Sequence, residues 1–218
     1  MKKLISIILV LSVLLITSSC TKDEDFFGSS NITSEIRNVA TFNKVSSEGI
    51  FTVNIFQGPV QSLEVITNAN IIHRLKTKVS NNKLEIYLSD GNYDNIVVEL
   101  NITVPNLNEI HNSGTGEIVV TELISSDNMK IVNSGTGSIR ISGSVTSLDI
   151  KNEGSGAIHC SQFMSTDTEV KIIGSGNCEV NCTGILNINI KGSGDVHYIG
   201  HPTINADISG SGEIIDAN

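Results

Sequence analysis

Apolar and polar residues alternate along most of the chain, with apolar residues at every second position in short segments. In the C-terminal half, a Gly-Ser/Thr-Gly triplet interrupts this alternation six times, with first glycines 21, 19, 20, 18 and 18 residues apart. The triplet glycines are Gly114 and Gly116, Gly135 and Gly137, Gly154 and Gly156, Gly174 and Gly176, Gly192 and Gly194, and Gly210 and Gly212. Alternation with a period of two is typical of β-strands, and a repeat of about 20 residues is typical of a solenoid.

Alignment of the repeats on the triplet places like residues at equivalent positions. Two residues after the second glycine lie Ile118, Ile139, Ile158, Cys178, Val196 and Ile214, and four residues before the first glycine lie Ile110, Ile131, Ile150, Val170, Ile188 and Ala206. Each repeat therefore predicts a strand, a tight turn and a second strand, and stacked repeats bury continuous apolar columns. We expect an all-β fold in which residues 106–218 form a parallel β-helix, or solenoid, of about six coils of 18–21 residues.

Asparagine replaces the apolar residue two positions before the triplet in the first three repeats. This position holds Asn112, Asn133 and Asn152, and then Ile172, Ile190 and Ile208. Because these asparagines are in phase with the apolar columns, they are predicted to point inward and to hydrogen-bond from coil to coil. The triplet glycines are interpreted as structural residues that allow φ > 0 and close backbone approach at the turns. They lack the third glycine and the helix of a phosphate-binding loop.

Residues 32–105 show strand patterning without the glycine repeat, with turn signals at Gln57-Gly58-Pro59, Asn81-Asn82 and Asp90-Gly91-Asn92. This pattern predicts an antiparallel β meander or a set of irregular first coils. Since residue 106 follows without a linker, we expect this region to cap the solenoid and residues 32–218 to form one continuous domain.

The N-terminus has the order of a bacterial export signal. Lys2 and Lys3 precede an apolar run over residues 4–16, which is too short to span a bilayer, and the small residues Ser18 and Ser19 precede Cys20. Residues 1–19 are therefore predicted to be a signal peptide. The segment resembles a bacterial lipobox, and this resemblance implies lipidation of Cys20. Acyl chains contribute about 0.8 kcal/mol per buried CH₂ and would anchor the chain in a membrane.

An acidic cluster follows at Lys22, Asp23, Glu24 and Asp25, at the start of a segment, residues 20–31, that we expect to be a flexible tether. The cluster is similar to the acidic export signal of Bacteroidota lipoproteins that reach the outer face of the outer membrane. The alternative is a solvent-exposed linker that carries no targeting signal.

The net charge and the composition limit the kinds of binding partner that the chain can have. Removal of residues 1–19, which include two lysines, leaves 199 residues with 12 basic and 23 acidic side chains and a formal charge of −11. Nucleic acid and anionic lipid are therefore poor partners. The chain has no Trp and three Tyr, so the aromatic surfaces on which sugars stack are scarce. Cys160, Cys178 and Cys182 are an odd number, so at least one is expected to be a small buried apolar residue.

Outward positions after the triplet bring one group of candidate ligands together. Stacked coils would place His159, Glu179 and His197 about 5 Å apart, close enough to share a zinc ion, although an exposed polar ladder is the preferred interpretation. No acid pair or basic cluster recurs along the outward positions, which disfavours a glycan-active enzyme. We predict no cofactor, no metal and no catalytic residue.

The order of several motifs resembles one family, the putative auto-transporter adhesin, head GIN domain, from about residue 35 to the C-terminus. The motifs are Arg37-Asn38-Val39 with Phe42, Phe51-Thr52-Val53-Asn54-Ile55 ending at Gly58, Ile102-Thr103-Val104-Pro105-Asn106-Leu107, and the glycine triplets. The resemblance implies an all-β fold ending in a β-helix and a location in the cell envelope. It brings no catalytic or binding residues with it.

Three functions are weighed. The favoured hypothesis is a surface-anchored adhesin or binding module in which the loops at residues 121–128, 161–167 and 200–203 contact an extracellular protein or glycan. The second is a structural or envelope-maintenance lipoprotein that faces the periplasm. The third is a glycan-active β-helix enzyme. The acidic cluster after Cys20 favours an outer-membrane lipoprotein that faces the cell exterior.

Overall fold

A computed structural model of the chain describes residues 24–125 and 127–218, and these residues contain β-strands and no α-helix. The signal peptide, Cys20, Lys22 and Asp23 lie outside the described residues. The strands are β1 (Asp25–Phe27), β2 (Ile32–Ile36), β3 (Lys44–Glu48), β4 (Thr52–Gln57), β5 (Ser62–Asn68), β6 (Leu75–Ser80), β7 (Lys83–Leu88), β8 (Asn92–Asp94), β9 (Val98–Val104), β10 (Glu109–Asn112), β11 (Glu117–Ile124), β12 (Asn128–Asn133), β13 (Ile139–Asn152), β14 (Ile158–Ile172), β15 (Cys178–Cys182), β16 (Ile185–Ile190), β17 (Val196–Ile199), β18 (Thr203–Ile208) and β19 (Ile214–Asp216). The all-β expectation is confirmed.

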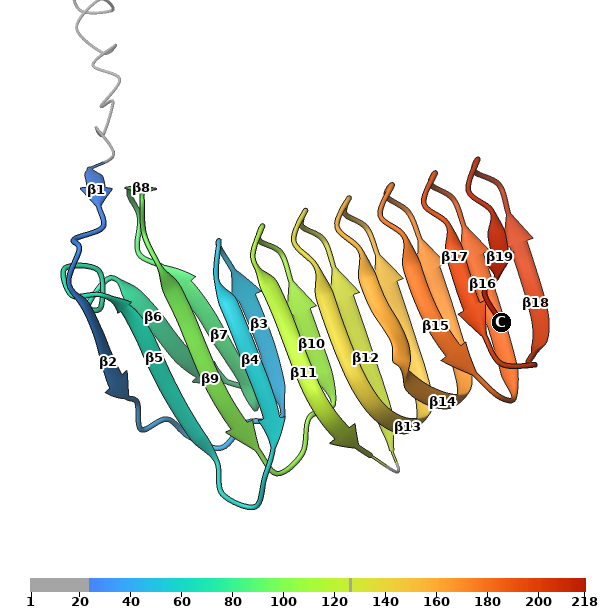
Figure 1. Cartoon of the computed structure of the whole chain (residues 1–218), viewed down its shortest axis with the longest axis horizontal. Helices are drawn as coiled ribbons and strands as arrows, with labels where there is room; N and C mark the ends of the chain where they lie inside the picture. The colour runs from blue at the N-terminus through green and yellow to red at the C-terminus, as the bar shows by residue number, and fades with distance from the viewer. Residues whose placement is uncertain (1–23, 126) are drawn as a thin grey trace, which may run out of the picture.

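The strands form one large curled sheet, apart from β1 and β8, which pair with each other. Figure 1 shows two rows of strands, with β5, β9, β4 and β11 in one row and β6, β7, β3 and β10 in the other. The long strands β13 and β14 bend and contribute to both rows: the start of β13 pairs with β11 and its end pairs with β12. The apolar side chains between the rows form one core cluster.

Strands of successive glycine repeats pair in parallel, and this pairing aligns the apolar positions. Ile110 pairs with Ile131 in one row, and Ile118 pairs with Ile139 in the other. All four side chains are fully buried. Equivalent apolar side chains of successive repeats therefore pair with each other and form buried columns, as the alternation predicted.

The N-terminal region differs from the expected antiparallel meander, because its pairing is mixed. The pairs β2–β5, β5–β9 and β6–β7 are antiparallel, whereas β3 pairs in parallel with β7 and β10, and β4 pairs in parallel with β9 and β11. Strands β3 and β4 form a strand-turn-strand unit like the later repeats but without a complete triplet. Ser47 takes the place of the buried asparagine in this unit, paired with Asn112. The sheet is thus a mixed sheet that continues without a break.

Residues 24–31 lie against the folded region rather than extending freely. Strand β1 pairs in parallel with β8, the Phe26 ring stacks on Tyr93 with 5.3 Å between ring centroids, and the Arg74 guanidinium lies 3.5 Å above the Phe26 ring. Arg74 also forms an ion pair with Glu24 at 3.1 Å, and Asn92 donates a hydrogen bond to Asp25. The part of the expected flexible tether that the structure describes is therefore held by strand pairing.

Within the described ranges, no helix has the length and apolar character needed to cross a membrane.

Candidate functional site

Four outward side chains form a row across the strands β13, β14, β15 and β17. The register pairs Arg140 with His159, His159 with Glu179, and Glu179 with His197. His159 Nδ1 lies 2.9 Å from Glu179 Oε1, and Ser161 Oγ donates to Glu179 Oε2 at 3.1 Å. Because an ionised carboxylate only accepts hydrogen bonds, His159 donates from Nδ1. The structure thus brings together the three residues singled out as a candidate ligand group.

A shallow depression of about 200 Å³ lies beside this row, lined by Ser161, Glu179, His197, Ile199 and Ala217. Burial alone raises the pKa of the Glu179 carboxyl, but hydrogen bonds from His159 and Ser161 and the charge of His159 together lower it below its ordinary value of 4.5. The depression therefore presents a carboxylate whose oxygens already accept two hydrogen bonds.

Zinc binding by this row has no support from the geometry. Across residues 24–125 and 127–218, no group of three or more His, Cys, Asp or Glu side chains is arranged to hold a metal ion. The Glu179 carboxylate instead pairs with His159 at the partly exposed surface, where such pairs contribute little to stability.

The three cysteines outside the export signal are fully buried and form no disulfide with one another. Burial, with smaller contributions from Cys178 and Glu179, raises the pKa of the Cys160 thiol well above its ordinary value. Burial also raises the pKa of Cys178 to about 12, although a hydrogen bond from Asn152 opposes the shift. Since the thiolate is the reactive form, both thiols act as small apolar core residues.

The triplet glycines lie where the backbones of successive repeats approach most closely. A Cβ atom added at Gly137 would overlap the carbonyl oxygen of Gly116, and one at Gly156 would overlap that of Gly137. Positive φ is found among the described glycines at Gly49, Gly91, Gly143 and Gly200, and not at the triplets. Close approach, rather than a left-handed backbone, therefore explains the triplet.

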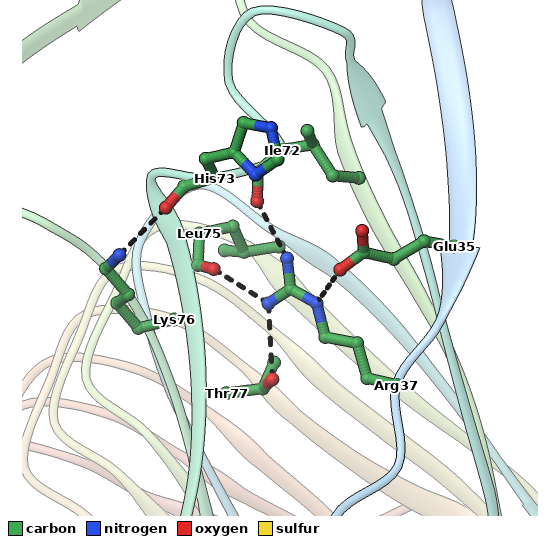
Figure 2. A network of polar contacts seen from close by, with 7 residues as sticks. All are labelled: Glu35, Arg37, Ile72, His73, Leu75, Lys76 and Thr77. Carbon is green, nitrogen blue, oxygen red and sulfur yellow. Dashed lines mark hydrogen bonds and ion pairs between the residues drawn. The ribbon is translucent and has the colours of Figure 1, made fainter.

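A polar network around Arg37 was not identified as a site from the sequence. The Arg37 guanidinium donates to the carbonyl oxygens of Ile72 and Leu75 at 2.7 Å, to Thr77 Oγ1 at 3.2 Å, and to Glu35 Oε1 at 2.6 Å (Figure 2). These bonds join the end of β2 to β6 and to the turn before it. Ile72, Leu75 and Thr77 lie 35 to 40 residues away in the chain, so only the presence of an arginine within the family motif pointed to this position.

The fold and these sites define the class of protein to which the chain belongs. It is an all-β, rod-like domain with rows of polar side chains on its surface and an interior filled by apolar side chains. Residues 41–202 match the model of the family described as putative auto-transporter adhesin, head GIN domain. The chain belongs to this family, which confirms the resemblance found in the sequence.

Two solved structures have the same fold as this chain. A putative adhesin from Bacteroides fragilis NCTC 9343 is 20% identical, with a TM-score of 0.69 over 87% of this chain and 98% of that chain. A putative lipid binding protein from Parabacteroides distasonis ATCC 8503 is 22% identical, with a TM-score of 0.59 over 89% of this chain and 100% of that chain. No curated protein matched the chain.

Proposed function

We propose that this chain is an outer-membrane lipoprotein, anchored through acylated Cys20, that displays its rod outside the cell as a non-catalytic adhesin or binding module. The order of the export signal and Cys20 in the sequence supports the anchor. Membership of a family described as putative adhesins supports the binding role. We further propose that the repeats of residues 106–218 wind as a parallel β-helix, because strands one repeat apart pair in parallel.

The observation that carries this proposal is the position of β1. Strand β1 lies at one end of the rod and β18 and β19 lie at the other (Figure 1). Asp25, the first residue of β1, lies only five positions after Cys20, a stretch of chain that extends over roughly 18 Å at most. An anchor at Cys20 would therefore hold the β1 end near the membrane and leave the remaining rows accessible to a partner.

One edge of the rod carries exposed apolar side chains that fit contact with an extracellular protein. Ile124 is 69% exposed and Met164 is 51% exposed. Both pair with Ser144, so they lie in one row across three successive repeats. They lie within residues 121–128 and 161–167, which the sequence indicated as contact loops, but in the structure Ile124 is the last residue of β11 and Met164 lies within β14. Exposed apolar groups of this kind are common at protein interfaces.

The test is protease shaving of intact cells, with the native chain compared with a variant in which Lys22, Asp23, Glu24 and Asp25 are replaced by alanine. We expect the native protein to be cleaved and the variant to be protected. A second variant, Arg74→Ala, controls for loss of the contact between Arg74 and Glu24 and should still be cleaved. Protection of the native chain would contradict surface display and would favour a periplasmic role in envelope maintenance.

A further inference from the structure

The end of the rod opposite β1 exposes apolar residues whose equivalents in the preceding repeat are buried. Ile204 and Ile208 of β18 are 36% and 45% exposed. Their partners on the preceding strand β16, Leu186 and Ile190, are fully buried. Strand β18 is the last strand of its row (Figure 1). The apolar column therefore ends on an uncovered face.

The backbone of β18 presents N–H and C=O groups along its open edge at this end of the rod. The N–H groups of Thr203 and Ser209 point back toward the preceding repeat, where they donate to the carbonyl oxygens of Gly184 and Ile190 at 2.7 and 2.9 Å. Backbone groups alternate in direction along a strand, so the N–H and C=O groups of Ile204, Ala206 and Ile208 point away from β16. Such an edge is a template for another strand.

We propose that β18 pairs with β18 of a second copy of this chain, antiparallel and about a two-fold axis at Ala206. In this register Ile204 lies opposite Ile208 of the second copy, and Ala206 lies opposite its own equivalent. These are the residues whose backbone groups point outward, so each opposing pair exchanges two hydrogen bonds. The exposed apolar side chains of the two copies cover each other.

Polar side chains on the other face of β18 select this register. With Ala206 on the axis, Asp207 lies opposite Asn205 of the second copy, so that an amide donor faces a carboxylate. Within one chain the same pairing already occurs, because Asn189 Nδ2 donates to Asp207 Oδ2 at 3.2 Å. An axis at Asp207 would place two carboxylates opposite each other, which is unfavourable. An axis at Asn205 would place Ile208 opposite Pro202, which lies outside β18 and has no N–H to donate.

The two-fold relation also limits the assembly to two copies. An isologous contact uses the same surface on both partners, so the open edge is consumed and no fibre grows. The β1 ends of the two rods then lie at opposite ends of the dimer.

Disulfide trapping tests the register directly. The chain carries Cys20→Ser and Ala206→Cys; the buried Cys160, Cys178 and Cys182 are not expected to react under mild oxidation. Opposed residues of a hydrogen-bonded antiparallel pair have Cα atoms about 5.5 Å apart, within disulfide range. We expect a crosslinked dimer on a non-reducing gel. Thr203→Cys is the matched control, because its two copies would lie roughly 20 Å apart, and it should remain uncrosslinked.

Light scattering of the Cys20→Ser chain gives a second measurement that needs no crosslink. We expect a mass twice that of one chain, and half that mass after Ile208→Lys, which puts a charge into the contact, or after Ala206→Pro, which removes an outward N–H. Ile36→Lys, on the strand β2 at the other end of the rod, should leave the dimer intact. A monomeric unsubstituted chain, or a dimer that survives both β18 substitutions, would overturn the proposal.

Discussion

Buried asparagines close the turns between the two rows. Asn112, Asn133 and Asn152 are fully buried. Asn152 Nδ2 donates to the carbonyl oxygen of Gly156 at 2.9 Å, and Asn133 Nδ2 donates to Asn152 Oδ1 at 3.3 Å. Asn112 Nδ2 donates in the same way as Asn152 to a carbonyl oxygen four residues later in its own turn, that of Gly116. The amides of Asn112 and Asn152 therefore donate to carbonyl oxygens of their own turns, and the bond from Asn133 to Asn152 links neighbouring repeats.

Asn152→Ala is expected to lower the free energy of unfolding by about 2–4 kcal/mol. The substitution leaves the Gly156 carbonyl and the Asn133 amide with fewer partners in a buried environment and opens a small cavity. Urea denaturation followed by circular dichroism measures the loss. Asn187→Ala, at an exposed outward position of β16, serves as the control and should change stability by less than about 0.5 kcal/mol. Equal losses in the two variants would contradict this role for Asn152.

Glu179 should contribute to stability in a pH-dependent way. Its pKa in the folded protein lies below the ordinary 4.5, so the unfolded chain binds the proton more tightly. The contribution is therefore complete above pH 4.5 and is lost as the pH falls through the pKa of the folded state. Because the side chain is more than one third exposed, we expect an effect below about 1 kcal/mol. Urea denaturation of Glu179→Gln between pH 3 and 6 should show a flatter pH dependence than the unsubstituted chain, and an unchanged slope would contradict it.

At the scale of elements, the strands of the glycine repeats could be predicted because apolar alternation and a fixed period act together over six copies. The unit formed by β3 and β4 was not singled out, although irregular first coils were one of the two alternatives for this region, since it contains Gly49 but no complete triplet and its partners lie far away in sequence. The pairing of β1 with β8 was missed for a different reason. Asp25 and Phe26 carry no strand alternation, and Phe26 is held by Arg74 and Tyr93, which no local pattern reveals.

Arg37 is the residue that most directly joins separate elements at the N-terminal end. We expect Arg37→Ala to reduce the free energy of unfolding by about 2–4 kcal/mol, because two backbone carbonyls lose a charged donor. Arg37→Lys should recover little, since an ammonium group cannot reach the same set of acceptors at once. Thermal or urea unfolding measures both. Arg140→Ala, with a side chain 56% exposed, is the control and should be nearly neutral. If Arg37→Lys were as stable as the unsubstituted chain, a positive charge at this position would be sufficient for stability, and the separate hydrogen bonds of the guanidinium would not be needed.

At the scale of the whole molecule, the two ends of the rod are closed in different ways. The antiparallel strands β2, β5 and β6 cover the N-terminal end, and Arg37 ties β2 to β6 across it. At the other end, β18 and β19 repeat the parallel pairing of the strands before them and leave Ile204 and Ile208 exposed. Repeat proteins need their ends covered to remain soluble. The asymmetry therefore directs association to the end that lies farther from Cys20.

This geometry leads to a prediction that combines the anchor with the dimer. The chain from Cys20 onward can be coupled through the Cys20 thiol to vesicles that carry maleimide lipid, while the buried cysteines remain unreactive. Because the β1 ends point away from each other in the dimer, two copies on separate vesicles should join them, and turbidity should rise. Vesicles that carry Ala206→Pro should stay dispersed, and those that carry Ile36→Lys should cluster. Dispersed vesicles from a chain that still forms the crosslinked dimer in solution would show that the two copies pair within one membrane instead.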